Sequence, residues 1–310
     1  MKPSICAIDE GGKKDEETEE KSMKTGLVLE GGAMRGMYTA GVLDVLMENE
    51  IMVDGAIGVS AGACFGCNYK SRQIGRSIRY NVKYCRDPRY VSIRSLLLTG
   101  DIYNAKFCYE ELPARLDPFD EETYRKNPME FYVVATDVNT GKAVYQRLDN
   151  GDLNDVQWIR ASASMPLVSR IVKIGEQELL DGGIADSVPF EWFAANGYEK
   201  NIVVLTQPKG YAKSKNPLMP LVRLRMRKYP KMIEAMANRH IEYNECLKQL
   251  EQREQEGNTL VIRPSVPLGI KRTEKNPKKL QAVYELGRKD AEAMLEKVRE
   301  FLTATGEIRM

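Results

Sequence analysis

The feature that most constrains the fold of this chain is a serine at the junction between an apolar run and a run of small residues. Residues 52–57 are mostly apolar, and residues 58–62 read GVSAG. This order is typical of a nucleophile elbow, in which a strand ends, a tight turn presents one serine and a helix begins. Gly58 and Gly62 suit the elbow because a side chain at either position would collide with the neighbouring strand or helix. The segment therefore predicts a strand, a turn and a helix, with Ser60 as candidate nucleophile.

Strands and helices alternate along the first two thirds of the chain. We expect strands at 26–30, 52–57, 131–136, 143–148, 172–174, 178–180 and 201–206, a later strand at 259–262, and helices at 35–50 and 152–165. A strand that leads through a helix to the next strand favours parallel pairing. The alternation therefore predicts an α/β protein with a mostly parallel central sheet.

Composition divides the chain into three parts. With 310 residues, of which 43% are hydrophobic and 29% charged, the chain can bury a full core as one large domain or two smaller ones. Residues 1–24 are rich in Glu, Lys, Asp and Gly, and we expect them to form a disordered lead. Residues 25–208 hold the alternating elements. Residues 209–310 are expected to be mainly helical and packed on this core, with long charged helices at 230–256 and 276–303 and no chemical motif of their own.

The charge balance and the cysteines argue against several classes of function. The formal net charge of +2 gives no reason to expect nucleic acid or an acidic ligand. No stretch approaches about 18 apolar residues and none resembles a signal peptide, so we expect a cytoplasmic protein without a membrane span. Six scattered cysteines are typical of free thiols in that compartment. Cys64 and Cys67 form a C-x-x-C pair, for which packing is favoured over a redox or metal role, and we expect no metal site and no cofactor.

A glycine-rich loop separates the first expected strand from its helix. Its candidate residues are Gly31, Gly32, Ala33, Met34, Arg35 and Gly36. Such a run gathers backbone N–H groups at a helix N-terminus, which suits an anion, either the oxyanion of an acyl transfer or a nucleotide phosphate. The dinucleotide fingerprint requires glycine where Ala33 stands, and Asp54 lies at the start of the second strand rather than its end. The oxyanion is therefore favoured.

An aspartate follows a later apolar strand. Asp181 comes directly after Leu179 and Leu180, and Gly182 and Gly183 leave its carboxylate unobstructed. Asp-Gly is also common turn material, and a five-residue serine pattern arises often by chance. Neither motif decides the function alone, so their order along the chain has to be considered.

Together the three motifs resemble the patatin-like phospholipase family. In order they are the loop with Arg35, the elbow at 58–62 and the aspartate at 181–183, while residues 160–166 resemble the segment that precedes the catalytic aspartate in bacterial members. The resemblance runs from about residue 25 to residue 206. It implies a three-layer α/β/α sandwich of patatin type, with the alternating part as catalytic core and a helical C-terminal addition.

The resemblance implies a serine esterase or lipid acyl hydrolase that needs no metal ion. Ser60 would attack the ester carbonyl, and Asp181 would accept its proton as general base. Backbone N–H groups around Gly32, Ala33 and Met34 would hold the oxyanion of the tetrahedral intermediate. The implied substrate is a lipid ester or a phospholipid, and its head group, acyl position and chain length stay open, as does the oligomeric state.

Two residues bear on this resemblance. Ala33 stands where the family has a third glycine, and a methyl group is tolerated there if φ is negative. The chain has one histidine, His240, on which a Ser-His-Asp triad would depend. His240 lies in a helical, amphipathic run and not on a loop after a late strand, so a serine–aspartate dyad is favoured. A free aspartate with a pKa near 4 is a weak base. The family resemblance implies that a site without water makes the aspartate a stronger base.

A basic segment in the last third of the chain allows two interpretations of what the protein contacts and of its function. Residues 209–228 hold seven basic residues and no acid, with apolar residues interleaved. The segment either rests on an anionic lipid surface, at the inner face of the membrane, or forms a solvated helix on the core. Arg35 either meets a lipid phosphate or braces its loop. The alternative function is a non-catalytic lipid-binding or regulatory protein, against which the combination of loop, serine and aspartate argues.

Overall fold

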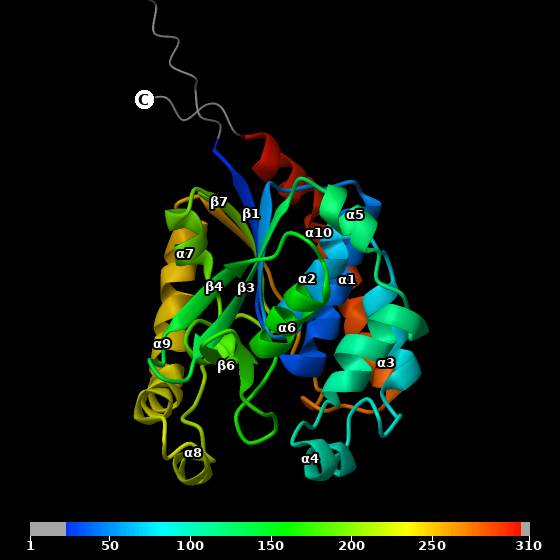
Figure 1. Cartoon of the computed structure of the whole chain (residues 1–310). Coiled ribbons are helices and arrows are strands. Elements are labelled where there is room, and N and C mark those ends of the chain that lie inside the picture. Colours follow the sequence, from blue (N-terminus) through cyan, green and yellow to red (C-terminus); the bar gives the residue numbers. More distant parts are fainter. Residues whose placement is uncertain (1–22, 305–310) are drawn as a thin grey trace, which may run out of the picture.

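The structure is a computed structural model that describes residues 23–304, so the lead expected at 1–24 lies outside the described residues except for its last two positions. Within this range the centre of the molecule is a sheet of eight strands (Figure 1). The strands are β1 Thr25–Leu29, β2 Gly55–Val59, β3 Glu130–Asp137, β4 Ala143–Arg147, β5 Val172–Ile174, β6 Gln177–Asp181, β7 Lys200–Val204 and β8 Thr259–Ile262. Their order is β5-β6-β3-β2-β1-β7-β8, and β4 pairs with β3 beside this path.

Most of the sheet is parallel, as expected. β1 pairs in parallel with β2 and β7, β2 with β3, and β7 with β8. β4, β5 and β6 add an antiparallel edge, in which β3 pairs with β4 and β6, and β5 with β6. Since parallel strands end at the same edge of a sheet, the segments that follow β1 and β2 lie side by side.

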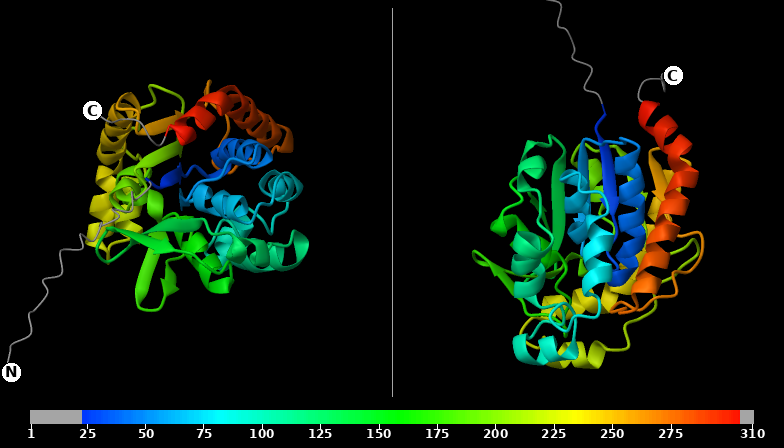
Figure 2. Two further views of the ribbon diagram at one scale, coloured as in Figure 1. Left: turned by 90° about the horizontal axis from the view of Figure 1, so that it is seen from above. Right: turned by 90° about the vertical axis from the view of Figure 1, so that its right-hand side faces the viewer.

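Helices cover both faces of the sheet and complete a three-layer α/β/α sandwich (Figures 1 and 2). The α-helices are α1 Met37–Glu48, α2 Ala61–Lys70, α3 Arg76–Tyr84, α4 Ile93–Thr99, α5 Glu121–Lys126, α6 Leu153–Ser162, α7 Phe190–Ala195, α8 Met219–Arg225, α9 Pro230–Gln255 and α10 Pro277–Thr303. Two short 3-10 helices, η1 Ala33–Gly36 and η3 Gly182–Ile184, and a π-helix, η2 Phe107–Leu116, complete the helical elements described. Successive strand residues point to opposite faces. Leu27 and Leu29 pack in the core shared with α1 and α10, whereas Val28 packs in the core shared with α7 and α9.

The C-terminal part supplies one long helix to each face of the sheet. Helix α9 covers one face, and α10 packs against α1 on the other (Figure 2). The approach of α10 to α1 is close, because a Cβ at Gly287 would overlap the carbonyl of Tyr38, and one at Gly41 would overlap the carbonyl of Tyr284. The Tyr284 hydroxyl also donates to the buried Asp44 carboxylate at 2.8 Å. The two helices start and end close to the expected residues.

Two elements differ from the expected bounds by three residues at one end. The second strand begins three residues later than expected, because the Asp54 carboxylate binds the N–H of Thr25 at 2.7 Å and turns the chain before the strand. Helix α6 ends at Ser162, three residues before its expected end. There the Ser164 hydroxyl donates to the carbonyl of Arg160 at 2.7 Å, so that a carbonyl of the last helical turn is hydrogen-bonded by a side chain.

We predict that Gly287→Ala lowers the free energy of unfolding by about 1–3 kcal/mol, because the added methyl group meets helix backbone that cannot move aside without separating α10 from α1. Urea denaturation followed by circular dichroism measures the change. Ala293→Val adds two methyl groups on the exposed side of the same helix and serves as the control. An equal loss in both variants would contradict the prediction.

Candidate active site

Ser60 occupies the tight turn between β2 and α2, where the sequence predicts an elbow. Its backbone has φ 55° and ψ −117°, a conformation that L-residues rarely adopt. Its N–H donates to the hydroxyl of the buried Ser162 at 2.9 Å. The glycine after it is needed for contact with β1, since a Cβ at Gly62 would overlap the carbonyl of Leu29. The turn therefore holds one serine in a strained but well-supported position.

The register of the sheet brings Asp181 to the level of this turn. Val59 pairs with Val134, and the next residue of β3, Ala135, pairs with Asp181 at the end of β6. Asp181 is 2% exposed, and its carboxylate accepts the N–H of Gly183 at 2.8 Å. The two candidate residues thus lie beside each other although they come from distant parts of the sequence.

Burial and nearby positive charge act on the Asp181 carboxyl in opposite directions. Burial raises the pKa of Asp181 above its ordinary value and is the largest effect. The guanidinium of Arg239 and the hydroxyl of Ser60 act to lower that pKa. A carboxylate with a raised pKa is a stronger base than a free aspartate, which is the property that a serine needs from its partner.

The glycine-rich loop lies beside Ser60, at the carboxyl end of β1. The negative φ that would make a methyl group at Ala33 tolerable is not what the structure shows, because φ there is +50°. Residues 31–36 otherwise form the expected turn into a helix, with η1 leading into α1. Within residues 23–304 the N–H groups of Ala33 and Ala61 have no hydrogen-bond partner, and both residues line the same cavity as Ser60. The Met34 N–H, one of the expected donors, instead donates to the carbonyl of Arg272 at 3.3 Å.

A cavity of about 610 Å³ opens beside Ser60. Aromatic side chains form much of its lining: Phe65, Tyr80, Tyr90, Tyr103, Tyr109, Phe119, Tyr124 and Tyr211. Such a volume and lining suit an extended apolar group. Cys64 and Cys67 also line the wall, and burial raises the pKa of these thiols to about 12 and about 11, so both are protonated at neutral pH. No cluster of metal-ligating side chains occurs among the described residues.

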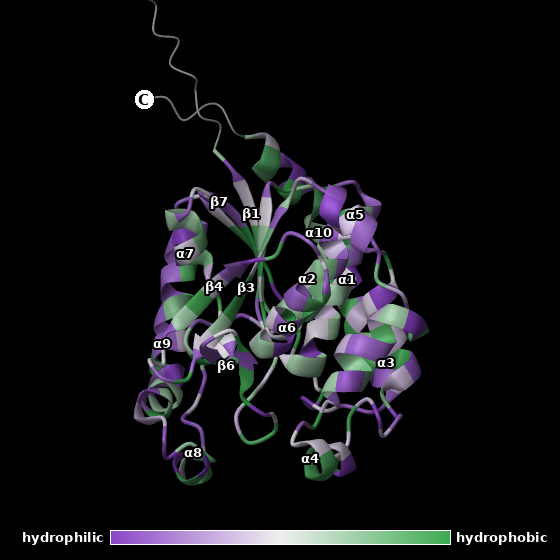
Figure 3. Ribbon diagram, in the orientation of Figure 1, coloured by the Kyte–Doolittle hydropathy of each residue, from purple (hydrophilic) through white to green (hydrophobic). Residues whose placement is uncertain are grey.

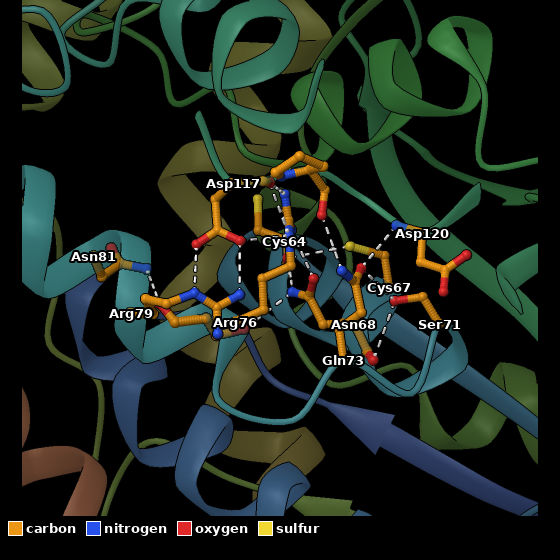
Figure 4. A network of polar contacts seen from close by, with 12 residues as sticks. Cys64, Cys67, Asn68, Ser71, Gln73, Arg76, Arg79, Asn81, Asp117 and Asp120 are labelled. Carbon is orange, nitrogen blue, oxygen red and sulfur yellow. Dashed lines mark hydrogen bonds and ion pairs between the residues drawn. The ribbon is translucent and has the colours of Figure 1, made fainter. Parts of the chain in front are cut away.

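A buried polar network fixes the wall of this cavity (Figure 4). Arg76 is buried and donates to the Asp117 carbonyl and to the Asn68 side chain, both at 2.7 Å. Arg79 donates two hydrogen bonds, of 2.7 and 2.8 Å, to the Asp117 carboxylate. The buried guanidinium of Arg76 thus donates three hydrogen bonds, and its Nε also lies 3.6 Å from the Asp117 carboxylate. This cation of the cavity lining therefore has an ion-pair partner.

His240 and three basic residues from the C-terminal part also line the cavity. His240 lies on α9, and its Nδ1 meets the carbonyl of Ala237 in the same helix at 3.0 Å, with no hydrogen bond to Ser60 or Asp181 among the described residues. Lys213, Arg239 and Arg272 were not expected at the site. No local motif marks them, because each is one of many basic residues and only the fold brings them to one place.

Comparison with known families gives two matches. A family model described as "Patatin-like phospholipase" matches residues 27–194, which is more than half of the chain. A second model, described as "Domain of unknown function (DUF6363)", matches residues 229–303. The second match contains α9 and α10, including two of the basic residues that line the cavity.

Several curated proteins are similar to part of the chain. The uncharacterized protein YjjU of Escherichia coli is 29% identical over 199 residues, which are 59% of this chain and 52% of that protein. The patatin-like phospholipase domain-containing protein ZK370.4 of Caenorhabditis elegans is 28% identical over 169 residues, 53% of this chain and 12% of that protein. The uncharacterized NTE family protein MT2641 of Mycobacterium tuberculosis is 27% identical over 169 residues, 53% of this chain and 27% of that protein. The chain thus matches about half or less of the length of each relative.

One solved structure in the comparison is VipD from Legionella pneumophila. It matches with a TM-score of 0.45 and 13% sequence identity, covering 90% of this chain and 69% of that chain.

We predict that Ser60→Gly is more stable than Ser60→Ala by about 1 kcal/mol. Both variants lack the hydroxyl, but only glycine adopts the observed φ and ψ without strain, and this relief exceeds the extra entropy that glycine loses on folding. Urea denaturation of the two variants measures the difference. An alanine variant of equal or higher stability would show that the turn is not strained.

Proposed function

The chain belongs to the patatin-like phospholipase family, a family of lipid ester hydrolases, and from this premise we propose that it is a metal-independent serine acyl hydrolase. In this proposal Ser60 is the nucleophile and Asp181 the general base. The observation that carries the proposal is the sheet register, which sets a buried carboxylate beside a strained serine at the edge of an apolar cavity. The substrates are carboxylic esters of lipids, of the phospholipase A, lysophospholipase or carboxylesterase type.

The proposed reaction proceeds through an acyl-enzyme. The Asp181 carboxylate accepts the proton of the Ser60 hydroxyl as its oxygen bonds to the ester carbonyl carbon. The negative charge that develops on the carbonyl oxygen is held by the N–H groups of Ala33 and Ala61. The alcohol leaves with the proton from Asp181. Water then gives a proton to Asp181 and attacks the acyl carbon, and Asp181 returns this proton to the Ser60 oxygen as the fatty acid leaves.

The alternative is a non-catalytic protein that binds lipid with the same fold. Such a protein has no use for a serine held at positive φ, nor for unpaired N–H groups beside it. Strained residues at a ligand site are retained where they serve the mechanism. This combination favours the hydrolase.

We predict that a fluorophosphonate probe labels the wild-type chain and that Ser60→Ala abolishes the labelling. Asp181→Asn is expected to slow labelling by roughly a thousandfold or more, as loss of the base does in other serine hydrolases. In-gel fluorescence measures both rates, and circular dichroism verifies folding. Absence of labelling in folded wild-type protein would contradict the proposal.

The controls separate the dyad from a triad and from metal chemistry. His240→Ala and treatment with EDTA should leave the labelling rate and the hydrolysis of p-nitrophenyl esters within about twofold of wild type. The Nδ1 of His240 contacts the carbonyl of Ala237 in the same helix, so removal of the imidazole changes no hydrogen bond of Ser60 or Asp181. Loss of activity in His240→Ala would favour a Ser-His-Asp triad.

Two helices at one end of the molecule expose apolar side chains beside the cavity. α4 and α8 lie at the lower end of the view in Figure 3, and a second view agrees (Figure 2). Their exposed apolar residues are Ile93, Leu97 and Leu98 on α4, and Leu218, Leu221 and Leu224 on or next to α8. Exposed basic residues accompany them: Arg94, Arg223, Arg225, Arg227 and Lys228. Leu218, just before α8, and Ile102, just after α4, line the cavity itself.

We propose that this surface of α4 and α8 rests on an anionic phospholipid bilayer, so that the protein acts in the cytoplasm at the inner membrane face. Apolar side chains ringed by cations are the combination that anionic membrane surfaces bind. Among the described helices, none combines the length and apolar character that a membrane crossing requires. In this proposal the basic segment at 209–228, which contains α8, forms one side of the membrane contact. α4 forms the other side, and the sequence analysis did not suggest it.

We predict that Leu97→Ser combined with Leu224→Ser lowers binding to phosphatidylserine-containing vesicles by about tenfold or more, because each leucine contributes on the order of 1–2 kcal/mol when buried in lipid. Cosedimentation measures binding. Ile241→Ser removes an exposed apolar side chain from α9 and is the control. Equal binding of the leucine variant and wild type, or equal binding to vesicles of phosphatidylcholine alone, would exclude this surface.

A further inference from the structure

Three cations of the C-terminal part share a cavity with Ser60, and the contacts that hold each of them involve uncharged groups. The backbone of Lys213 forms a reciprocal pair with the Asn244 side chain on α9, with distances of 2.7 and 3.0 Å. The Lys213 ammonium lies 3.7 Å from the centre of the Tyr243 ring. The Nε of Arg239 donates to the carbonyl of Gly183, two residues after the candidate base.

Arg272 lies on the exposed loop before α10 and is anchored through its backbone. Its carbonyl accepts hydrogen bonds from the Met34 N–H at 3.3 Å and from the Tyr103 hydroxyl at 3.2 Å. These two contacts come from the glycine-rich loop and from the cavity wall. Arg272 is one of the residues that line the cavity, and these contacts fix its backbone beside the loop that follows β1.

None of these three cations forms an ion pair within residues 23–304. A fourth cation, Arg35, adds to the positive charge, and its Nε is buried without a hydrogen-bond partner. This arrangement contrasts with Arg76, another cation of the cavity lining, whose guanidinium donates three hydrogen bonds and pairs with the Asp117 carboxylate.

Two carboxylates act on Lys213 and Arg272 within the cluster, Glu30 and Asp181. Glu30 is 3% exposed and accepts the Thr206 N–H at 2.6 Å and the Tyr243 hydroxyl at 2.7 Å. Arg239 also lines a second cavity, which is lined by the carboxylates Asp186, Glu191 and Glu242 as well. The other three cations, Lys213, Arg272 and Arg35, still outnumber the two carboxylates that act on them.

The repulsion inside the cluster is strong enough to affect protonation. Burial lowers the pKa of the Lys213 ammonium to about 7, and repulsion from Arg239, Arg35 and Arg272 adds to the lowering. The Glu30 carboxylate opposes it, and the Tyr243 hydroxyl stays neutral because burial raises its pKa. Like charges gathered without a partner cost stability, and a bound anion would relieve that cost.

We propose that Lys213, Arg239 and Arg272 bind the phosphate group of a glycerol-linked ester substrate whose acyl chain lies in the aromatic part of the cavity. This inference rests on the proposed hydrolase function, because it assigns the two ends of the substrate relative to Ser60. Guanidinium and ammonium groups are the usual protein partners of phosphate oxygens. The C-terminal part, including α9 and the loop before α10, then selects the substrate, whereas the core supplies the nucleophile and the base.

Water-soluble esters test the proposal without a membrane. The probes are 1-butyrylglycerol and its 3-phosphomethanol derivative, which carries one fixed negative charge. In Lys213→Met and in Arg272→Gln we expect the ratio of kcat/KM for the charged ester to that for the neutral ester to fall about 10- to 100-fold, the range for one charge-assisted hydrogen bond. Lys271→Gln, an exposed neighbour outside the cavity lining, is the control and should keep the wild-type ratio.

A binding measurement separates this proposal from the hydrolase proposal. In Ser60→Ala, calorimetry with sn-glycero-3-phosphomethanol should detect binding that glycerol lacks and that Lys213→Met weakens. If the diester binds but the wild-type chain is not labelled by fluorophosphonate, the anion site is kept and the hydrolase is rejected. If the wild-type chain is labelled but does not discriminate between the charged and the neutral ester, the hydrolase is kept and the anion site is rejected. If inorganic phosphate binds as tightly as the diester and the ester ratio is unchanged in both variants, the site takes free phosphate and the assignment to substrate is wrong.

The pH dependence provides a readout that a purely structural lysine would not alter. Lys213 with a pKa of about 7 is charged below that pH, so affinity for the fixed-charge diester should fall as the pH rises through 7 towards 9. Lys213→Arg stays charged throughout, and its affinity should be independent of pH in this range. An unchanged pH profile in Lys213→Arg would overturn the role of Lys213.

Discussion

The whole site depends on the pairing of β1, β2, β3 and β6 in one register. Parallel pairing sets the loop after β1 next to the turn after β2, and the antiparallel β6 returns Asp181 to the same level. This pairing requires close backbone approach at the turn, which Gly62 and Gly182 allow, since a Cβ at either would overlap a strand carbonyl. A slip of one residue in β6 would turn the Asp181 side chain to the opposite face of the sheet.

Much of the core could be predicted from sequence because its signals are local. The alternation of strands and helices, the serine turn and the start of α9 at Pro230 all follow from neighbouring residues. The backbone of Ala33 could not be predicted, because its positive φ is imposed by the loop around it and alanine does not favour it. The aspartate needed the family resemblance, since Asp-Gly-Gly alone is ordinary turn material.

The residues that sequence reasoning missed lie far apart along the chain. Lys213, Arg239 and Arg272 meet only because α9 covers one face of the sheet while the chain returns through β8 to the loop before α10. A basic residue in a charged helix gives no sign that it faces a cavity rather than solvent. The exposed leucines of α4 were missed for a related reason, because a short amphipathic helix looks the same in sequence whether or not its apolar face is covered.

The hydrogen bond between the Met34 N–H and the Arg272 carbonyl determines when the candidate site is completed during synthesis of the chain. Ser60, Asp181 and the loop are synthesised before the residue that fastens the loop. A nascent chain, or one cut by a protease before Arg272, holds Ser60 and Asp181 without the contact that steadies the loop beside them. The candidate site is therefore completed only after Arg272 has been synthesised and has docked on the loop after β1.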